Sequence, residues 1–94
     1  MPLKELTLKS TEALKVARAL SSETSIKILE LLSKEKLDVS TIARRLKLSE
    51  AYMSQEINQL AGLRLIRVGY APGKRGIRKI CELAVKKVTI IIRE

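Results

Sequence analysis

Three amide side chains lie close together in the second half of the chain, at Gln55, Asn58 and Gln59. An amide donates and accepts hydrogen bonds in one plane, which suits paired hydrogen bonds to the edge of an adenine base in the major groove of DNA. The alternative is that these amides only keep an exposed helix soluble. A helical projection at about 100° per residue places six residues opposite the apolar positions or beside them: Ala51, Tyr52, Ser54, Gln55, Asn58 and Gln59.

Basic residues are the second group with evident chemistry. The chain has 19 Lys and Arg against 10 Asp and Glu, and residues 64–94 contain nine basic and two acidic residues, which is +7 of the total charge of +9. A polyanion is therefore the first partner to expect, although a basic surface can also be merely solvated. Six cations are expected to contact the DNA backbone or reach an adjacent minor groove: Arg44, Arg45, Lys74, Arg75, Arg78 and Lys79.

Residues for other chemistries are scarce. The chain has no His and a single Cys, Cys81, so an internal disulfide and any His-containing metal site are excluded. We find no nucleophile with a base and no paired acids, and the run from Gly73 to Gly76 is too short for a nucleotide-binding loop. We therefore predict no catalysis, no metal and no cofactor, and we interpret Cys81 as a small core side chain in a strand.

Helical spacing and capping residues must position these side chains. Ser10 or Thr11 can cap the first helix, Asp38 can accept hydrogen bonds from the amides that open the third, and Ser49 is the predicted N-cap of the helix that carries the amides. Gly62 is expected to end that helix in the left-handed conformation. The predicted helices cover residues 10–20, from 23 to between 33 and 36, 40–46 and 49–61.

Strand-like patterns dominate the rest of the chain. A β-hairpin is predicted over 65–83, with residues 71–76 as its turn and basic residues at its tip. Residues 5–9 read as a short strand or an extended lead-in. The β-branched segment 85–93 predicts a C-terminal strand that is buried on both faces or forms one face of a subunit contact.

These elements predict a mainly helical α+β class with a winged helix-turn-helix architecture: three helices, a β-hairpin wing and extra terminal strands. Residues 1–94 are long enough for one domain with one modest core, and that core must be aliphatic because the chain has no Trp and no Phe. The helix-turn-helix covers 39–61 and the wing 65–83. Within the helix-turn-helix, the side chain of Leu48 is expected to fill the turn between the two helices.

The two helices of the helix-turn-helix have different predicted roles. Met53, Ile57 and Leu60 bury one face of the second helix, so that its other face is pushed outward toward a groove. Glu50 and Glu56 fall nearer the buried side, so these acids need not face phosphates.

Residues 19–81 carry a motif known from one family. Ala19-Leu20-Ser21-Ser22-Glu23-Thr24 precedes Ile28-Leu29 and Leu31-Leu32, and Ile42-Ala43-Arg44-Arg45-Leu46-Lys47-Leu48-Ser49 follows. The chain thereby resembles the ArsR-type winged helix regulators of bacteria and archaea. The resemblance implies a winged helix that binds DNA and regulates transcription.

Three departures from that family matter. Lys47 stands where a turn glycine is usual, and Arg64 stands where glycine commonly precedes the wing strand, so both positions are expected to need backbone adjustment. The cysteine pair that metal sensors of this type carry near the first helix of the motif is absent. Metal sensing is therefore not expected here.

Together these features predict a sequence-specific regulator that binds double-stranded DNA. The alternative is a winged helix used for protein contacts within a larger complex. A homodimer is expected through the first helix and any unpaired terminal strand, with Val88, Ile90 and Ile92 contributing. No apolar stretch approaches the ~20 residues that cross a bilayer and the start is no signal peptide, so no membrane partner and a cytoplasmic location are expected.

Overall fold

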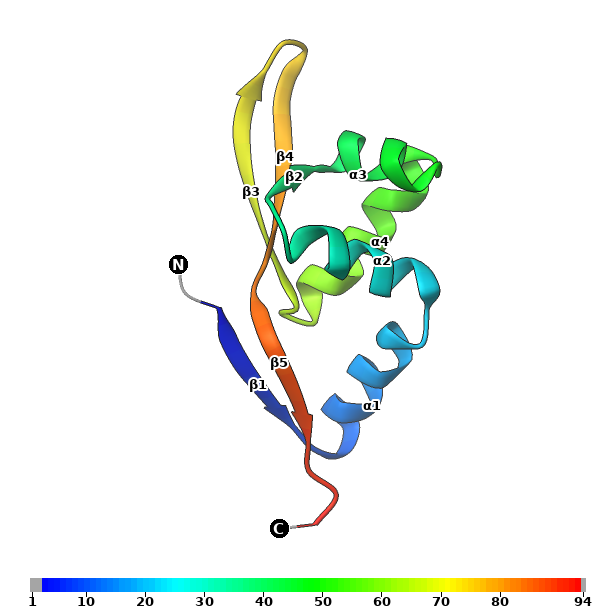
Figure 1. Ribbon diagram of the computed structural model, residues 1–94, viewed down its shortest axis with the longest axis vertical. Helices are drawn as coiled ribbons and strands as arrows, with labels where there is room; N and C mark the ends of the chain where they lie inside the picture. The colour runs from blue at the N-terminus through cyan, green and yellow to red at the C-terminus, as the bar shows by residue number, and fades with distance from the viewer. Residues whose placement is uncertain (1–2, 94) are drawn as a thin grey trace.

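The computed structural model describes residues 3–93, which form four helices and five strands (Figure 1). The predicted α+β class is confirmed, and α1 stands in addition to the three helices expected of a winged domain. Within residues 3–93, no helix is long and apolar enough to span a membrane. In chain order the elements are β1 (Lys4–Leu8), α1 (Ser10–Leu20), α2 (Glu23–Leu32), β2 (Leu37–Asp38), α3 (Val39–Leu46), α4 (Glu50–Gly62), β3 (Ile66–Gly73), β4 (Gly76–Leu83) and β5 (Val85–Ile90).

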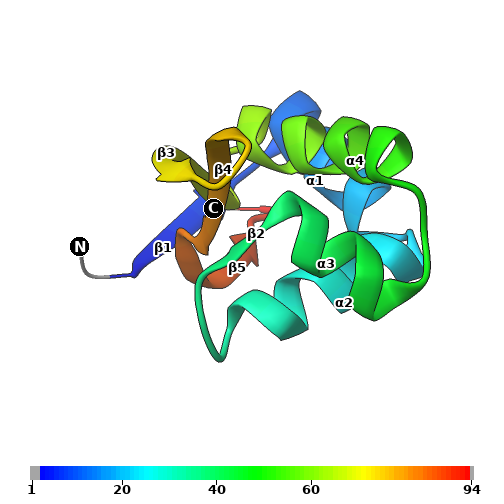
Figure 2. The ribbon, with the colours of Figure 1, turned by 90° about the horizontal axis from the view of Figure 1, so that it is seen from above.

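An aliphatic core joins the last three helices to the β3–β4 hairpin. Ile28 of α2, Ile42 of α3 and Ile57 of α4 are completely buried, together with Leu65 and Cys81 at the hairpin's root. Apolar residues three and four positions apart fall on one side of each helix, which is why the three helices can share one core. Seen from above, α2, α3 and α4 gather on one side of the hairpin (Figure 2).

Side-chain oxygens fix the start of three helices. Asp38 Oδ1 accepts a hydrogen bond from the backbone N–H three residues later at 2.9 Å, and Ser49 Oγ does the same at 3.1 Å. Both predicted N-caps are thus confirmed, and Ser22 caps α2 in the same way. For α1 the predicted range of 10–20 is confirmed but the predicted cap is wrong, because Ser10 is already the first residue of the helix and its start has no side-chain cap.

Both helices of the helix-turn-helix end at a residue with a left-handed backbone. Lys47 follows α3 with a φ of 59°, and Arg64 follows α4 with a φ of 64°. In each case the N–H of the next residue donates to the carbonyl five residues back at 3.0 Å. This is the Schellman pattern, which usually employs glycine at the left-handed position because a side chain is strained there.

Two predictions about these helix ends need correction. Gly62 does not end α4 in the left-handed conformation, since it is the last residue of the helix and Arg64 turns the chain instead. Leu48 does not plug the turn: it is 37% exposed, and backbone hydrogen bonds close the turn. The expected backbone adjustment at Lys47 and Arg64 is confirmed, because both adopt the conformation that glycine provides more easily.

We call the β3–β4 hairpin the wing. β4 lies at the centre of an antiparallel sheet in the order β2-β4-β3. The turn is shorter than predicted: Gly73 pairs with Gly76, which leaves only Lys74 and Arg75 between the strands. Gly76 has a φ of 113°, a conformation that side chains other than glycine rarely adopt. The turn projects beyond the helices at the top of Figure 1.

β1 and β5 pair in parallel as a separate two-stranded sheet. The expected strand near residues 5–9 is therefore confirmed. The prediction for residues 85–93 needs correction, since β5 ends at Ile90 and is not buried on both faces. Val85 and Val88 pack partly against the core, whereas the residues between them are exposed, because the pair has the core on one side only. This sheet lies at the end of the molecule opposite the wing turn (Figure 1).

Glycine at the left-handed positions should stabilise the fold. We expect Lys47→Gly and Arg64→Gly each to raise the free energy of unfolding by about 0.5–1 kcal/mol, because relief of strain outweighs the added freedom of the unfolded chain. Urea denaturation measures the change.

Two glycines provide the matched controls. Gly62 lies in α4 with open space around its Cα, so Gly62→Ala should stabilise by a similar ~0.5–1 kcal/mol. Gly76→Ala should destabilise because of its φ of 113°. A loss of stability in both left-handed variants would contradict this account of strain.

Candidate nucleic-acid interface

α4 has one buried and one outward face, as predicted. Met53, Ile57 and Leu60 are completely buried, so the helix cannot rotate without exposing them. The six residues predicted for the outward face are all at least partly accessible to solvent. Five are exposed, namely Ala51, Tyr52, Gln55, Asn58 and Gln59, and Ser54 is half-buried.

The wing touches this face through one hydrogen bond. Lys79 Nζ of β4 donates to Asn58 Oδ1 of α4 at 2.5 Å. Two residues that the sequence placed on separate parts of a DNA-binding surface thus contact one another. The contact orients the Asn58 amide, because its oxygen is engaged by the wing and its N–H groups remain available as donors.

A carboxylate at the start of α3 holds the wing from the other side. Asp38 Oδ1 caps α3, and Asp38 Oδ2 accepts a hydrogen bond from Arg78 Nε at 2.9 Å. Hydrogen bonding by Thr41, followed by Arg78, lowers the pKa of the Asp38 carboxyl, against an opposing effect of burial. Arg78, predicted for the DNA backbone, thus uses its Nε to position β4, while its side chain stays 51% exposed. The sequence identified Asp38 as a cap but gave no sign of this second role.

The remaining predicted cations differ in how well they are compensated. Arg45 lies 3.8 Å from Glu35, which is a loose, exposed ion pair. Arg44, Lys74 and Arg75 are exposed, and within residues 3–93 they have no hydrogen-bond or ion-pair partner. Arg44 belongs to α3, and Lys74 and Arg75 form the wing turn.

A groove of about 460 Å³ opens between the wing and the starts of α3 and α4. Ser40, Glu50 and Ser54 line its helical side, and Ile77 and Lys79 line the side of the wing. The prediction that Glu50 lies toward the buried side is wrong, since Glu50 is exposed and faces this groove. An acid at the start of α4 is favourable for the helix dipole, which accounts for its position.

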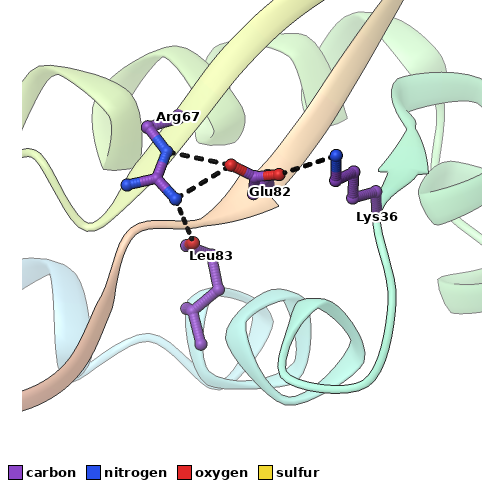
Figure 3. Close-up of polar contacts among 4 residues, drawn as sticks. All are labelled: Lys36, Arg67, Glu82 and Leu83. Carbon is purple, nitrogen blue, oxygen red and sulfur yellow. Dashed lines mark hydrogen bonds and ion pairs between the residues drawn. The ribbon is translucent and has the colours of Figure 1, made fainter. Parts of the chain in front are cut away.

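A second carboxylate holds the root of the wing (Figure 3). Glu82 Oε1 accepts hydrogen bonds from Arg67 Nε and Nη2, each at 2.9 Å, and Lys36 Nζ lies 3.1 Å from Glu82 Oε2. Arg67 also donates to the Leu83 carbonyl at 3.4 Å. Hydrogen bonds from Arg67 and then Lys36 lower the pKa of Glu82. Through Glu82, Arg67 joins β3 to β4, and Lys36 joins the hairpin to the loop before β2.

Cys81 is buried in β4, which agrees with its predicted role in the core. Burial raises the pKa of its thiol to about 11, so the thiol stays protonated at neutral pH. Over the part of the chain that the structure describes, no three His, Cys, Asp or Glu side chains gather as a metal ion would require.

Three helices that bury one core, a helix-turn-helix and a β-hairpin beside the second of its helices define the winged helix-turn-helix class. The sequence model described as "Bacterial regulatory protein, arsR family" matches residues 22–68. The chain therefore belongs to the arsR family of bacterial regulatory proteins, which are DNA-binding transcription regulators. The matched segment runs from the cap of α2 into β3.

Solved structures show the same fold. Reduced HlyU from Vibrio cholerae superimposes with a TM-score of 0.68 at 23% identity, over 80% of this chain and 75% of its own. NolR from Sinorhizobium fredii gives 0.66 at 21% identity, over 80% and 71%. The homodimeric winged helix-turn-helix DNA-binding domain of Mb0332 from Mycobacterium bovis gives 0.67 at 22% identity, over 78% and 64%. A comparison with curated protein sequences found no match.

Asp38 should make stability depend on acid. Asp38→Ala should lower the free energy of unfolding at pH 7 by about 1 kcal/mol through loss of the cap, and Asp38→Asn should retain much of the cap. Because the folded pKa lies below the ordinary 3.8, the charge of Asp38 stabilises the fold above pH 3.8, and this contribution disappears as pH falls through the folded value.

The measurement is urea denaturation at pH values from 7 to 2.5. The stability difference between the wild type and Asp38→Asn should be largest at neutral pH and shrink below about pH 4. A difference that stays constant over this range would show that the charge of Asp38 does not contribute.

Proposed function

We propose that this regulator reads specific sites in double-stranded DNA, with α4 in the major groove and the wing on the adjacent backbone or minor groove. One observation carries the proposal: the outward amide face of α4 lies beside a wing turn whose cations, Lys74 and Arg75, have no partner within residues 3–93, and Arg75 lines the groove between the wing and α4. A helix in the major groove has phosphates beside it, so free cations at this turn fit the backbone of a duplex.

The hydrogen bonds divide the six predicted backbone contacts by role. Arg44, Lys74 and Arg75 are free to neutralise phosphates. Arg45 is held only by its loose ion pair with Glu35, so it can do the same. Arg78 and Lys79 each use one hydrogen bond to hold the wing against α3 and α4, and their remaining N–H groups can still bind phosphates. Of the amides, Gln55 and Gln59 can donate and accept, whereas Asn58 donates while its oxygen is bound to Lys79.

A protein-contact module remains the alternative function, since a fold does not determine a partner. Free cations concentrated at the wing turn favour DNA, because a protein partner would require a matching acidic surface. Binding to random duplex at low salt separates the two functions.

We also propose a homodimer. Mb0332 is described as homodimeric, and the end of this chain opposite the wing exposes apolar side chains. Leu14 of α1 is 51% exposed, Ile90 42% and Ile92 92%, and Val88 lies half-buried beside them in β5. β1 and β5 pair with each other, so a second copy would pack on their surface and on α1 rather than replace either strand.

The wing turn should govern the salt dependence of binding. Replacing Lys74 and Arg75 with Ala should weaken binding to every duplex and reduce the slope of log K against log salt by nearly 2, because about two fewer counterions are released. Fluorescence anisotropy across a salt series measures the slope.

The double variant Lys27→Ala, Lys34→Ala is the matched control. It removes the same charge from exposed positions in and just after α2, outside the wing and outside the proposed dimer surface. Its slope should stay close to that of the wild type. Equal slopes for the two double variants would place the DNA elsewhere on the molecule.

Selection from random duplex DNA should reveal the amide contacts and the dimer together. The wild type should enrich a two-fold symmetric site with half-sites about one helical turn apart. Gln55→Ala and Asn58→Ala should each relax one position of the half-site, at about 1–3 kcal/mol per lost base contact. Equal losses of affinity on selected and random DNA would contradict the base-reading role of these amides. Enrichment of a single half-site would contradict the proposed dimer.

A further inference from the structure

Two large apolar side chains on the wing are strongly exposed. Ile77 is 79% exposed and Tyr70 69%, although both lie in regular strands. The pairing places Tyr70 opposite Lys79 and Pro72 opposite Ile77, in steps of two from the pair of half-buried Val68 and buried Cys81. Side chains two apart on a strand share a face, so Tyr70, Pro72 and Ile77 continue the core face of the wing beyond the core.

This face turns toward α4. Lys79 shares this face, since it pairs with Tyr70 and follows Ile77 by two residues on β4. Its Nζ donates a hydrogen bond to Asn58 of α4. Ile77 itself lines the groove between the wing and the starts of α3 and α4. The exposed isoleucine therefore stands where a DNA strand would pass between the two elements that the proposed function places in neighbouring grooves.

The charges around Ile77 indicate what covers it. Lys74 and Arg75 in the turn are uncompensated within residues 3–93, and Arg75 and Lys79 line the same groove. The groove also contains two acids, Glu50 and the Asp38 that Arg78 engages, so its cations outnumber its acids. A second copy of the chain would bring its own cations to this rim and be repelled. A nucleic-acid strand fits, because it alternates anionic phosphates with sugar rings whose surface is largely apolar.

We propose that Ile77, supported by Pro72, packs on the deoxyribose rings of the DNA strand that occupies this groove. The inference rests on the proposed function and adds to it an apolar contact that contributes to affinity for any sequence. Burial of apolar surface releases no counterions, so this contribution should not depend on salt as the contributions of Lys74 and Arg75 do.

Ile77→Val and Ile77→Thr test the contact as a matched pair. Both residues are β-branched and similar in shape, and they differ by a methyl group against a hydroxyl. The Thr variant should bind duplex DNA about five- to tenfold more weakly than the Val variant, with the salt slope of the wild type in both. Thermal unfolding of both should match, because the site is exposed in the free protein.

The outcomes separate this inference from the proposed function. Equal affinities of the Val and Thr variants, in a protein whose Lys74 and Arg75 variant does lose salt-dependent binding, would overturn the contact and leave the function in place. A change of sedimentation in the Thr variant without a change in DNA affinity would assign the face to a second copy and also overturn it. Failure of the wild type to bind any duplex at low salt would overturn both.

Discussion

The burial of one face of α4 is the constraint on which the rest of the interface depends. Met53, Ile57 and Leu60 are completely enclosed by the core. Exposing one such side chain costs about 1.5–3 kcal/mol, a large part of the stability of a domain this small. The rotation of the helix is therefore fixed, and with it the direction in which Gln55 and Asn58 project. The outward surface of α4 is thus set by packing on its opposite side.

The distribution of acids determines which cations remain free. Asp38 engages Arg78, Glu82 engages Arg67 and Lys36, and Glu35 lies near Arg45. Asp38 and Glu82 thus engage cations of the wing strands. Within residues 3–93, no acid pairs with Lys74 or Arg75 in the turn, although Glu50 lines the same groove as Arg75. A basic chain thus uses its few acids to fix the hairpin and leaves its far end positive.

Local signals in the sequence were reliable wherever the structure depends on neighbours along the chain. The caps at Asp38 and Ser49 could be predicted because a carboxylate or hydroxyl bonds an amide only three residues away. The end of α4 could not, since glycine is the usual left-handed residue and Gly62 stood nearby, while Arg64 takes that conformation. At Arg64, the hydrogen bonds that the turn makes to the last carbonyls of α4 outweigh the strain of a left-handed backbone at a residue other than glycine.

Interactions between distant segments were the other limit. Nothing in residues 4–8 indicates that they pair in parallel with residues 85–90, and the apolar run of β5 suggested burial on both faces. The bonds from Arg78 to Asp38 and from Lys79 to Asn58 span 40 and 21 residues, so no pattern in the sequence indicated that these cations also hold the wing in place. The exposure of Ile77 could not be predicted either, because a hydrophobic residue in a strand is normally expected to lie in the core.

The two ends of the molecule lie far apart. The described chain extends over 51 Å along its longest axis, with the cationic wing turn at one end and the β1–β5 sheet at the other (Figure 1). Both ends expose cations and apolar side chains: Lys74, Arg75 and Ile77 on the wing, and Lys86, Lys87 and Ile90 on β5. Association at the β1–β5 end would bury apolar surface that a small domain leaves exposed, and it would leave the wing turns of both copies accessible. The distance between the two ends therefore allows the chain to associate with itself and to meet a polyanion without either surface obstructing the other.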